Sequence, residues 1–160
     1  MPTYTTEGLD KVARNIGIEG IHLFACSCVR KQGNLPNDLE IQEKYDIAVI
    51  EEKPVTKTFF VDHHLGIRGV IPKQDGEADV WFHIEATFRL TYLLSKRRGF
   101  ITKSDVESFA YINSVVHVWP YWRQFVQTRS TEMGLPTFLL GILPPRQTLT
   151  SLIETKKANQ

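Results

Sequence analysis

Residues 104–145 combine a long apolar stretch with clear signals for where helices start and stop. Ser104 and Glu107 have the spacing of a capping box, in which a hydroxyl and a carboxylate each bond to a free backbone N–H. The spacing predicts a helix that begins near Asp105. Its apolar residues extend almost all round the cylinder, which indicates cover by its own sheet and by another copy of the chain. The residues expected at that subunit interface are Ile112, Val115, Val118 and Trp119.

Pro120 interrupts this helix. A proline inside a helix has no N–H to donate and clashes with the preceding turn, so we expect a kink or a restart at Trp119-Pro120. An amphipathic segment over residues 121–133 follows, and its apolar stripe consists of Trp122, Phe125, Val126 and Met133. Gly134 then supplies the left-handed residue past the helix end, and Pro136 prevents the helix from resuming.

Strands are predicted upstream of these helices. The first spans residues 18–30 and has apolar residues at both parities, which predicts cover on both faces. A polar N-terminal segment precedes this strand, and a connection over residues 31–43 follows it. The other strands are expected at residues 45–50, 56–71 and 80–93. The last two alternate apolar and polar residues, which predicts one packed face and one polar face, and Asp75-Gly76 marks the hairpin turn between them. Strands followed by helices are typical of an α+β domain with an antiparallel sheet and helices on one face.

The composition is that of one ordinary globular domain. The chain has 160 residues, of which 42% are hydrophobic and 23% charged. We expect a single domain over residues 1–160, with an ordered core from about residue 16 to about residue 154. The net charge of +1 gives no electrostatic reason to expect binding to nucleic acid or to an anionic membrane. The N-terminus lacks the apolar core of a signal peptide, and no run approaches the ~20 apolar residues that span a bilayer, so we expect a cytoplasmic protein.

Motifs that carry catalysis or bind metal are few. Asp62-His63-His64 is similar to a motif of metal-dependent phosphoesterases, but adjacent histidines in a strand point to opposite faces and no companion cluster completes a site. We expect Asp62 and His64 to form a hydrogen-bonded pair on the surface. Cys26 and Cys28 cannot make a four-thiolate zinc site, so we expect buried free thiols. With no nucleophile elbow and no phosphate-binding loop, the sequence predicts a protein that is not an enzyme and needs no metal or cofactor.

One alternative concerns the polar face of the sheet. Trp81, His83 and Arg89 share that face in the strand over residues 80–93, and RNA-binding sheets present aromatic and basic residues in this way. Glu85 lies on the same face, however, and the glycine-aromatic signature of the common RNA-recognition module is absent. Binding of nucleic acid is therefore the less favoured hypothesis, and an RNA-binding or protein-interaction module stays the alternative from another class. His117, next to the predicted kink, is expected to have a hydrogen-bond partner.

The order F-x-x-x-N, W-P-Y-W-R, G-x-P and L-P-P over residues 109–145 resembles the SecB family of protein-export chaperones. The matching positions are Asn113, Pro120, Tyr121, Arg123, Gly134, Pro136 and Pro144. The resemblance covers about a quarter of the chain.

This resemblance implies a four-stranded antiparallel sheet with a long kinked helix and a short C-terminal helix packed on one face. It also implies a homotetramer, assembled as a dimer of dimers through the long helices. The function implied is that of an ATP-independent holdase, which binds unfolded or precursor polypeptides in apolar grooves during protein export. Burial of apolar surface at ~25 cal/mol per Å² would drive such binding.

Apolar residues of the connection, of the segment after the long helix and of a stripe near the C-terminus are the candidates for the client groove. They are Leu35, Leu39, Ile41, Phe138, Leu139, Ile142, Leu149, Leu152 and Ile153. Packing into the core is the alternative for them, above all for the group around Phe138. Typical members of the family are strongly acidic and dock the translocase motor ATPase, whereas this chain is nearly neutral and ends in KKANQ. Docking of the motor is therefore in doubt, and a SecB-like chaperone that binds the antitoxin of a toxin-antitoxin system is the alternative.

Overall fold

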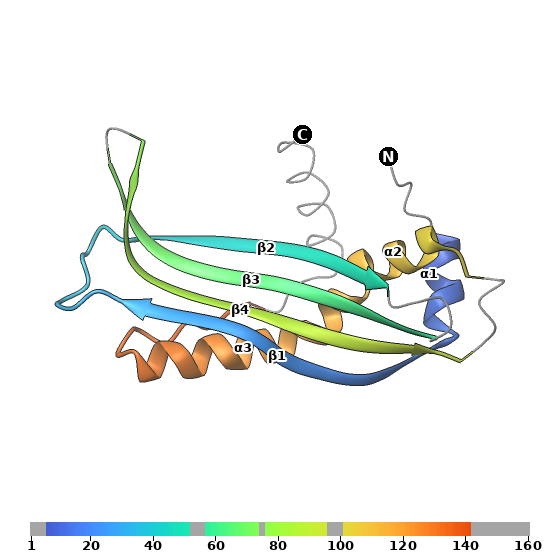
Figure 1. Ribbon diagram of the computed structural model, residues 1–160. Coiled ribbons are helices and arrows are strands. Elements are labelled where there is room, and N and C mark those ends of the chain that lie inside the picture. The colour runs from blue at the N-terminus through green and yellow to red at the C-terminus, as the bar shows by residue number, and fades with distance from the viewer. Residues whose placement is uncertain (1–5, 52–56, 74–75, 96–100, 142–160) are drawn as a thin grey trace.

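A computed structural model describes residues 6–51, 57–73, 76–95 and 101–141 (Figure 1). The elements in chain order are α1 (Thr6–Ala13), β1 (Ile16–Arg30), β2 (Glu40–Glu51), β3 (Thr58–Pro72), β4 (Ala78–Leu94), α2 (Lys103–Ile112) and α3 (Ser114–Glu132). The predicted α+β fold, with a four-stranded antiparallel sheet and a long bent helix, is confirmed. The predicted short C-terminal helix lies outside the described residues. Helix α1 was not predicted, and its Val12 is fully buried.

The sheet has the strand order β1-β4-β3-β2, and every neighbouring pair is antiparallel. Strands β1 and β2 are therefore the two edges, and the connection between them crosses from one edge of the sheet to the other. The helices lie on one face of the sheet, and the ends of β3 and β4 that adjoin their connection curl away from the helix layer (Figure 1). The β3–β4 hairpin closes through Gly76, which has the left-handed φ of +85° that glycine favours, as Asp75-Gly76 predicted. None of the described helices is long and apolar enough to cross a bilayer.

The core lies between the sheet and the helices. As the alternation predicted, one parity of β3 and β4 is buried; the buried residues are Phe59, Val61, Leu65, Ile67, Phe82, Ile84, Ala86, Phe88, Leu90 and Tyr92. Helix α3 packs on β4 and β3, while α2 packs on α1 and β2. From α3, Val118, Trp122 and Val126 enter this core, which confirms the amphipathic pattern of its second half.

Strand β1 corrects one prediction. Its register against β4 shifts between Ile18 and Gly20 and again between Leu23 and Ala25. Each shift is a bulge that moves the following residues to the other face of the sheet. Apolar residues therefore occur at both parities of β1, although the chain does not cover both faces of the strand. The chain by itself leaves this edge strand largely exposed, and its exposed apolar residues are Ile18, Leu23, Phe24 and Val29. The expectation of two buried thiols is also wrong, because Cys26 is exposed and Cys28 is half-buried.

The start and the break of the long helix also differ from the predictions. The capping box is made by Thr102 and Asp105, whose side chains bond to each other's backbone N–H at 3.2 Å and 2.8 Å. The break falls at Asn113, and Pro120 lies inside α3. The proline removes the donor for the carbonyl of Val116, but Val116 is exposed, so water can satisfy this carbonyl. Ser114 bonds back to the carbonyl of Ala110, a contact that bends helices.

Helix α3 ends as predicted. Gly134 has a left-handed φ of +65°. The N–H of Gly134 donates to the carbonyl of Thr131, and the N–H of Leu135 donates to that of Ser130, at 3.0 Å and 2.9 Å. These two bonds form a Schellman motif, which satisfies carbonyls that the helix leaves free. Pro136 then leads into an extended exit segment, residues 135–141.

Substitution of Gly69 by alanine is expected to destabilise the fold. A Cβ atom at Gly69 would lie 2.3 Å from the ring of Phe82 and 2.5 Å from Cδ2 of Leu39. Gly69→Ala should therefore lower the free energy of unfolding by about 1–3 kcal/mol in denaturant titrations. Gly17→Ala is the matched control, since nothing lies within 4 Å of a Cβ there. Equal stability of the two variants would contradict the packing of Leu39 against the sheet.

Candidate functional site

The exit segment runs back along α3 and leaves a groove beside it. The indole Nε1 of Trp119 donates to the carbonyl of Gly141 at 3.0 Å, which fixes the far end of the segment to the helix. The groove has a volume of about 210 Å³ and is lined by Pro120, Arg123, Gln124, Gln127, Phe138, Leu139 and Leu140. The side chain of Leu139 is 78% exposed, the largest exposure among the large apolar residues that the structure describes. The groove is therefore an apolar strip beside neutral amides and one guanidinium.

Part of the predicted groove set meets around Phe82 at one end of the sheet. The ring of Phe138 lies 5.5 Å from that of Phe82, and Leu39 packs on the same part of the sheet at Gly69. Leu35 is half-buried against the core, as are Leu39 and Phe138. Ile41 is 44% exposed and pairs with Gly69, so it belongs to β2 and not to the predicted connection. The other predicted groove residues, Ile142, Leu149, Leu152 and Ile153, lie outside the described residues.

The residues of the SecB-like motif have different environments. Asn113 marks the helix break, Gly134 and Pro136 shape the exit, and Pro120 and Arg123 line the groove. Tyr121 is exposed, and Pro144 lies outside the described residues.

The predicted interface residues divide into two groups. Val115 and Val118 are buried in the chain's own core, whereas Ile112 and Trp119 are half-buried. Only the second group retains surface for a partner, and the subunit interface itself stays a prediction.

A buried polar chain holds the helix break against the sheet. His63 is fully buried, with Nδ1 2.7 Å from the hydroxyl of Tyr45 and Nε2 2.8 Å from that of Ser114. Ser114 donates its proton to the carbonyl of Ala110, so it accepts from Nε2–H, and Nδ1 accepts from Tyr45. Burial lowers the pKa of His63 to about 3 and raises the pKa of Tyr45 well above its ordinary value, so both groups are neutral.

The sequence did not predict these hydrogen bonds between Tyr45, His63 and Ser114, because the three residues lie far apart in the sequence. A signal was present, since His63 has the parity of the buried residues Val61 and Leu65. The hydrogen-bond partner that was predicted for His117 is confirmed, because Nδ1 of His117 lies 2.9 Å from the hydroxyl of Tyr92.

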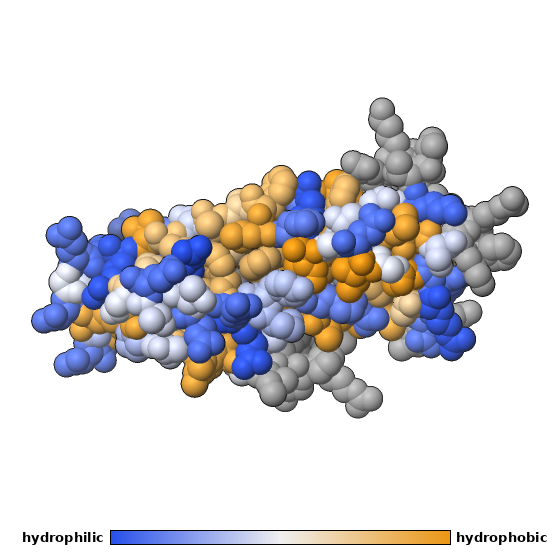
Figure 2. All heavy atoms as spheres, turned by 90° about the horizontal axis from the view of Figure 1, so that it is seen from below, coloured by the Kyte–Doolittle hydropathy of each residue, from blue (hydrophilic) through white to orange (hydrophobic). Residues whose placement is uncertain are grey.

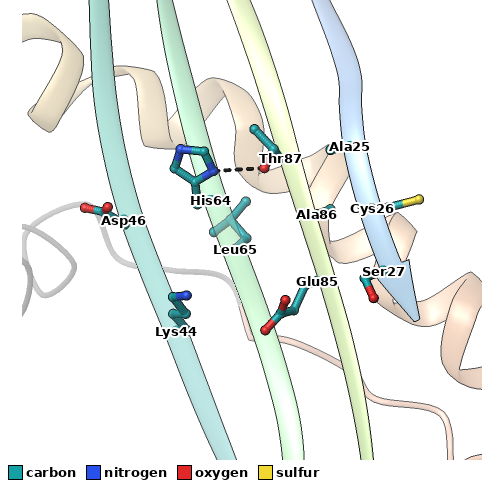
Figure 3. Close-up of a pocket in the computed structure, with 10 residues that line it drawn as sticks. All are labelled: Ala25, Cys26, Ser27, Lys44, Asp46, His64, Leu65, Glu85, Ala86 and Thr87. Carbon is teal, nitrogen blue, oxygen red and sulfur yellow. Dashed lines mark hydrogen bonds between the residues drawn. The ribbon is translucent and has the colours of Figure 1, made fainter. Parts of the chain in front are cut away.

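The opposite face of the sheet carries a shallow depression of about 320 Å³, whose lining includes Lys44, Asp46, His64, Glu85 and Thr87 (Figure 3). His64 points across it to Thr87, with Nδ1 2.9 Å from the hydroxyl. The expected Asp62–His64 pair is wrong, because Asp62 accepts two bonds of 2.7 Å from Arg89 and is almost fully buried. No cluster of metal-ligating side chains occurs among the described residues.

The residues of the RNA-binding alternative share this open face, yet their charge is largely compensated. The guanidinium of Arg89 is bound by Asp62 and lies 4.1 Å from the ring centroid of Phe24. Nε2 of His83 lies 2.9 Å from the hydroxyl of Ser27. Phosphate binding requires available positive charge, so this arrangement does not favour nucleic acid.

Figure 2 shows the surface from the helix side. Polar side chains cover the two ends of the elongated molecule, and apolar side chains gather between them (Figure 2). Contiguous exposed apolar patches often mark binding surfaces in soluble proteins. Leu139, which is 78% exposed, makes the groove beside α3 the candidate site.

Comparison with solved structures identifies the fold as SecB-like. The chain is similar to the Mycobacterium tuberculosis Rv1957 SecB-like chaperone, solved in complex with a ChAD peptide from the Rv1956 HigA1 antitoxin. The TM-score is 0.72 and the identity 17%, and the match covers 86% of this chain and 97% of the other. A Streptococcus agalactiae protein of unknown function matches at a TM-score of 0.36 with 11% identity, over 79% of this chain and 97% of the other. No protein-family model and no curated protein sequence matches the chain.

Proposed function

We propose that this protein is an ATP-independent chaperone that binds non-native polypeptides in the apolar groove beside α3. The observation that supports this most directly is Leu139, whose side chain is 78% exposed beside Phe138 and Leu140 on a SecB-like fold. An extended client that covers such side chains gains ~25 cal/mol for each Å² of apolar surface removed from water. This binding needs no bond-making step, in keeping with a protein that is not an enzyme.

Among possible clients, an antitoxin is favoured over precursors destined for export. The structural relative was solved with an antitoxin peptide, and the fold is shared over most of both chains. The charges of this chain also speak against export. The open sheet face carries Asp62 and Asp79, but their carboxylates are paired with Arg89 and Lys31. Asp46 and Glu85 also line this face, beside Lys44, but the net charge of +1 shows that the chain as a whole is not strongly acidic.

A homo-oligomer, with a tetramer as the expected form, is part of the same proposal. Strand β1 is a 15-residue edge with exposed apolar side chains, a feature that isolated soluble chains avoid. A second copy that covers this edge around Ile18, Leu23 and Phe24, together with the half-buried Ile112 and Trp119 of the long helix, would remove that surface from water and leave Val29 exposed.

Suppression of aggregation tests the function. A chemically unfolded test protein is diluted into buffer without ATP, and light scattering is followed with and without equimolar tetramer. We expect suppression that persists at high salt, because apolar burial is not screened, whereas RNA binding would weaken steeply. Absence of suppression, together with a monomer in sedimentation, would exclude the proposal.

A further inference from the structure

The charges that line the groove suggest which polypeptides it prefers. Arg123 is the one charged side chain among its lining residues. Within the described part of the chain, Arg123 has no acidic partner, whereas the neighbouring Arg129 is bound to Glu132 at 2.6 Å. Among the described residues, the groove therefore presents one positive charge without an acidic partner, beside apolar side chains.

The groove also has polar groups suited to an extended main chain. Gln124 and Gln127 line it, and each amide can both donate and accept a hydrogen bond. Residues 136–141 form no helix or strand, and their backbone groups make no hydrogen bond to other described backbone groups. A segment laid alongside them could pair with this backbone, as in strand addition, while its apolar side chains contact Leu139.

We propose that this groove selects extended apolar segments in which an Asp or Glu side chain stands next to the apolar residue that contacts Leu139. The carboxylate pairs with Arg123, and a Lys or Arg at the same place is repelled. The inference rests on the proposed function, since it concerns the occupant of the same groove. Apolar burial alone would not select among apolar segments, whereas Arg123 would favour those that carry a negative charge.

Three labelled peptides that differ at one position test the inference. Each carries the same extended apolar segment, with Glu, Gln or Lys beside the central leucine, and binding is measured by fluorescence anisotropy. At low salt the Glu peptide should bind about two- to five-fold more tightly than the Gln peptide, the range of an exposed ion pair, and the Lys peptide should bind least. High salt should bring the three affinities together.

Variants of Arg123 decide whether the preference comes from this residue. Arg123→Gln should make the affinities of the three peptides equal, and Arg123→Glu should reverse their order. Arg68→Gln is the matched control, because Arg68 lies on the open face, bonded to Gln42, and this variant should keep the wild-type order. Equal affinities in the wild type, failure of all three peptides to bind, or an unchanged order in Arg123→Gln would overturn the inference. Suppression of aggregation by the same wild-type protein would show that the proposed function survives this failure.

Discussion

Acidification from pH 6.5 towards pH 3 is expected to destabilise the protein through His63. Its folded-state pKa of about 3 lies below the ordinary value of 6.5, because burial disfavours the charged ring. Between these values the unfolded chain binds a proton that the folded chain does not bind, so stability falls as the pH falls. One such group contributes a slope of up to about 1.4 kcal/mol per pH unit.

Replacing His63 by a residue that does not titrate separates its contribution to the pH dependence of stability from that of the other titratable groups. His63→Gln should lower the free energy of unfolding near neutral pH by about 1–3 kcal/mol, since Tyr45 loses its partner. It should also flatten the pH dependence in the upper part of this range. Denaturant titrations at several pH values measure both effects, with His22→Gln at an exposed position as the control. A variant with the same pH slope as the wild type would show that His63 is not the group responsible.

Removal of one exposed apolar side chain is expected to weaken client binding with little effect on stability. Leu139→Ser should reduce the affinity for an unfolded polypeptide about ten-fold or more, because a buried leucine side chain contributes about 1.5–3 kcal/mol. Its unfolding free energy should change by less than about 0.5 kcal/mol, as expected for an exposed position.

Val29→Ser provides the matched control for this loss. Val29 is 54% exposed and pairs with His83, on the opposite face of the sheet. Its replacement should leave client affinity unchanged. Affinities that fall equally in the two variants would place the client elsewhere or show that binding depends on exposed apolar area in general.

The parts of the fold that were predictable are those set by local chemistry. Alternation identified the buried faces of β3 and β4, and Gly134-x-Pro136 identified the end of α3. The helix break was misplaced because Pro120 gives a strong local signal. The contact that holds the break, from Ser114 to His63, joins residues that are 51 positions apart.

The candidate site was predictable only in part, for a similar reason. The sequence identified both Phe138 and Leu139 as apolar groove candidates. In the structure Phe138 packs on the core, whereas Leu139 is exposed. The bulges of β1 reverse its parity twice, so a simple pattern could not tell an exposed edge from a strand covered on both faces. Arg123 was identified as part of a motif, but its position in the groove required the structure.

Site-specific photo-crosslinking shows whether an unfolded client binds beside α3. A photoreactive phenylalanine analogue is placed at Leu139, beside α3, or at Val29, on the opposite face, and each protein is irradiated with an unfolded polypeptide in the absence of ATP. We expect crosslinks to the client from position 139 and few from position 29. Crosslinks mainly from position 29, or none from position 139, would show that the client does not bind beside α3.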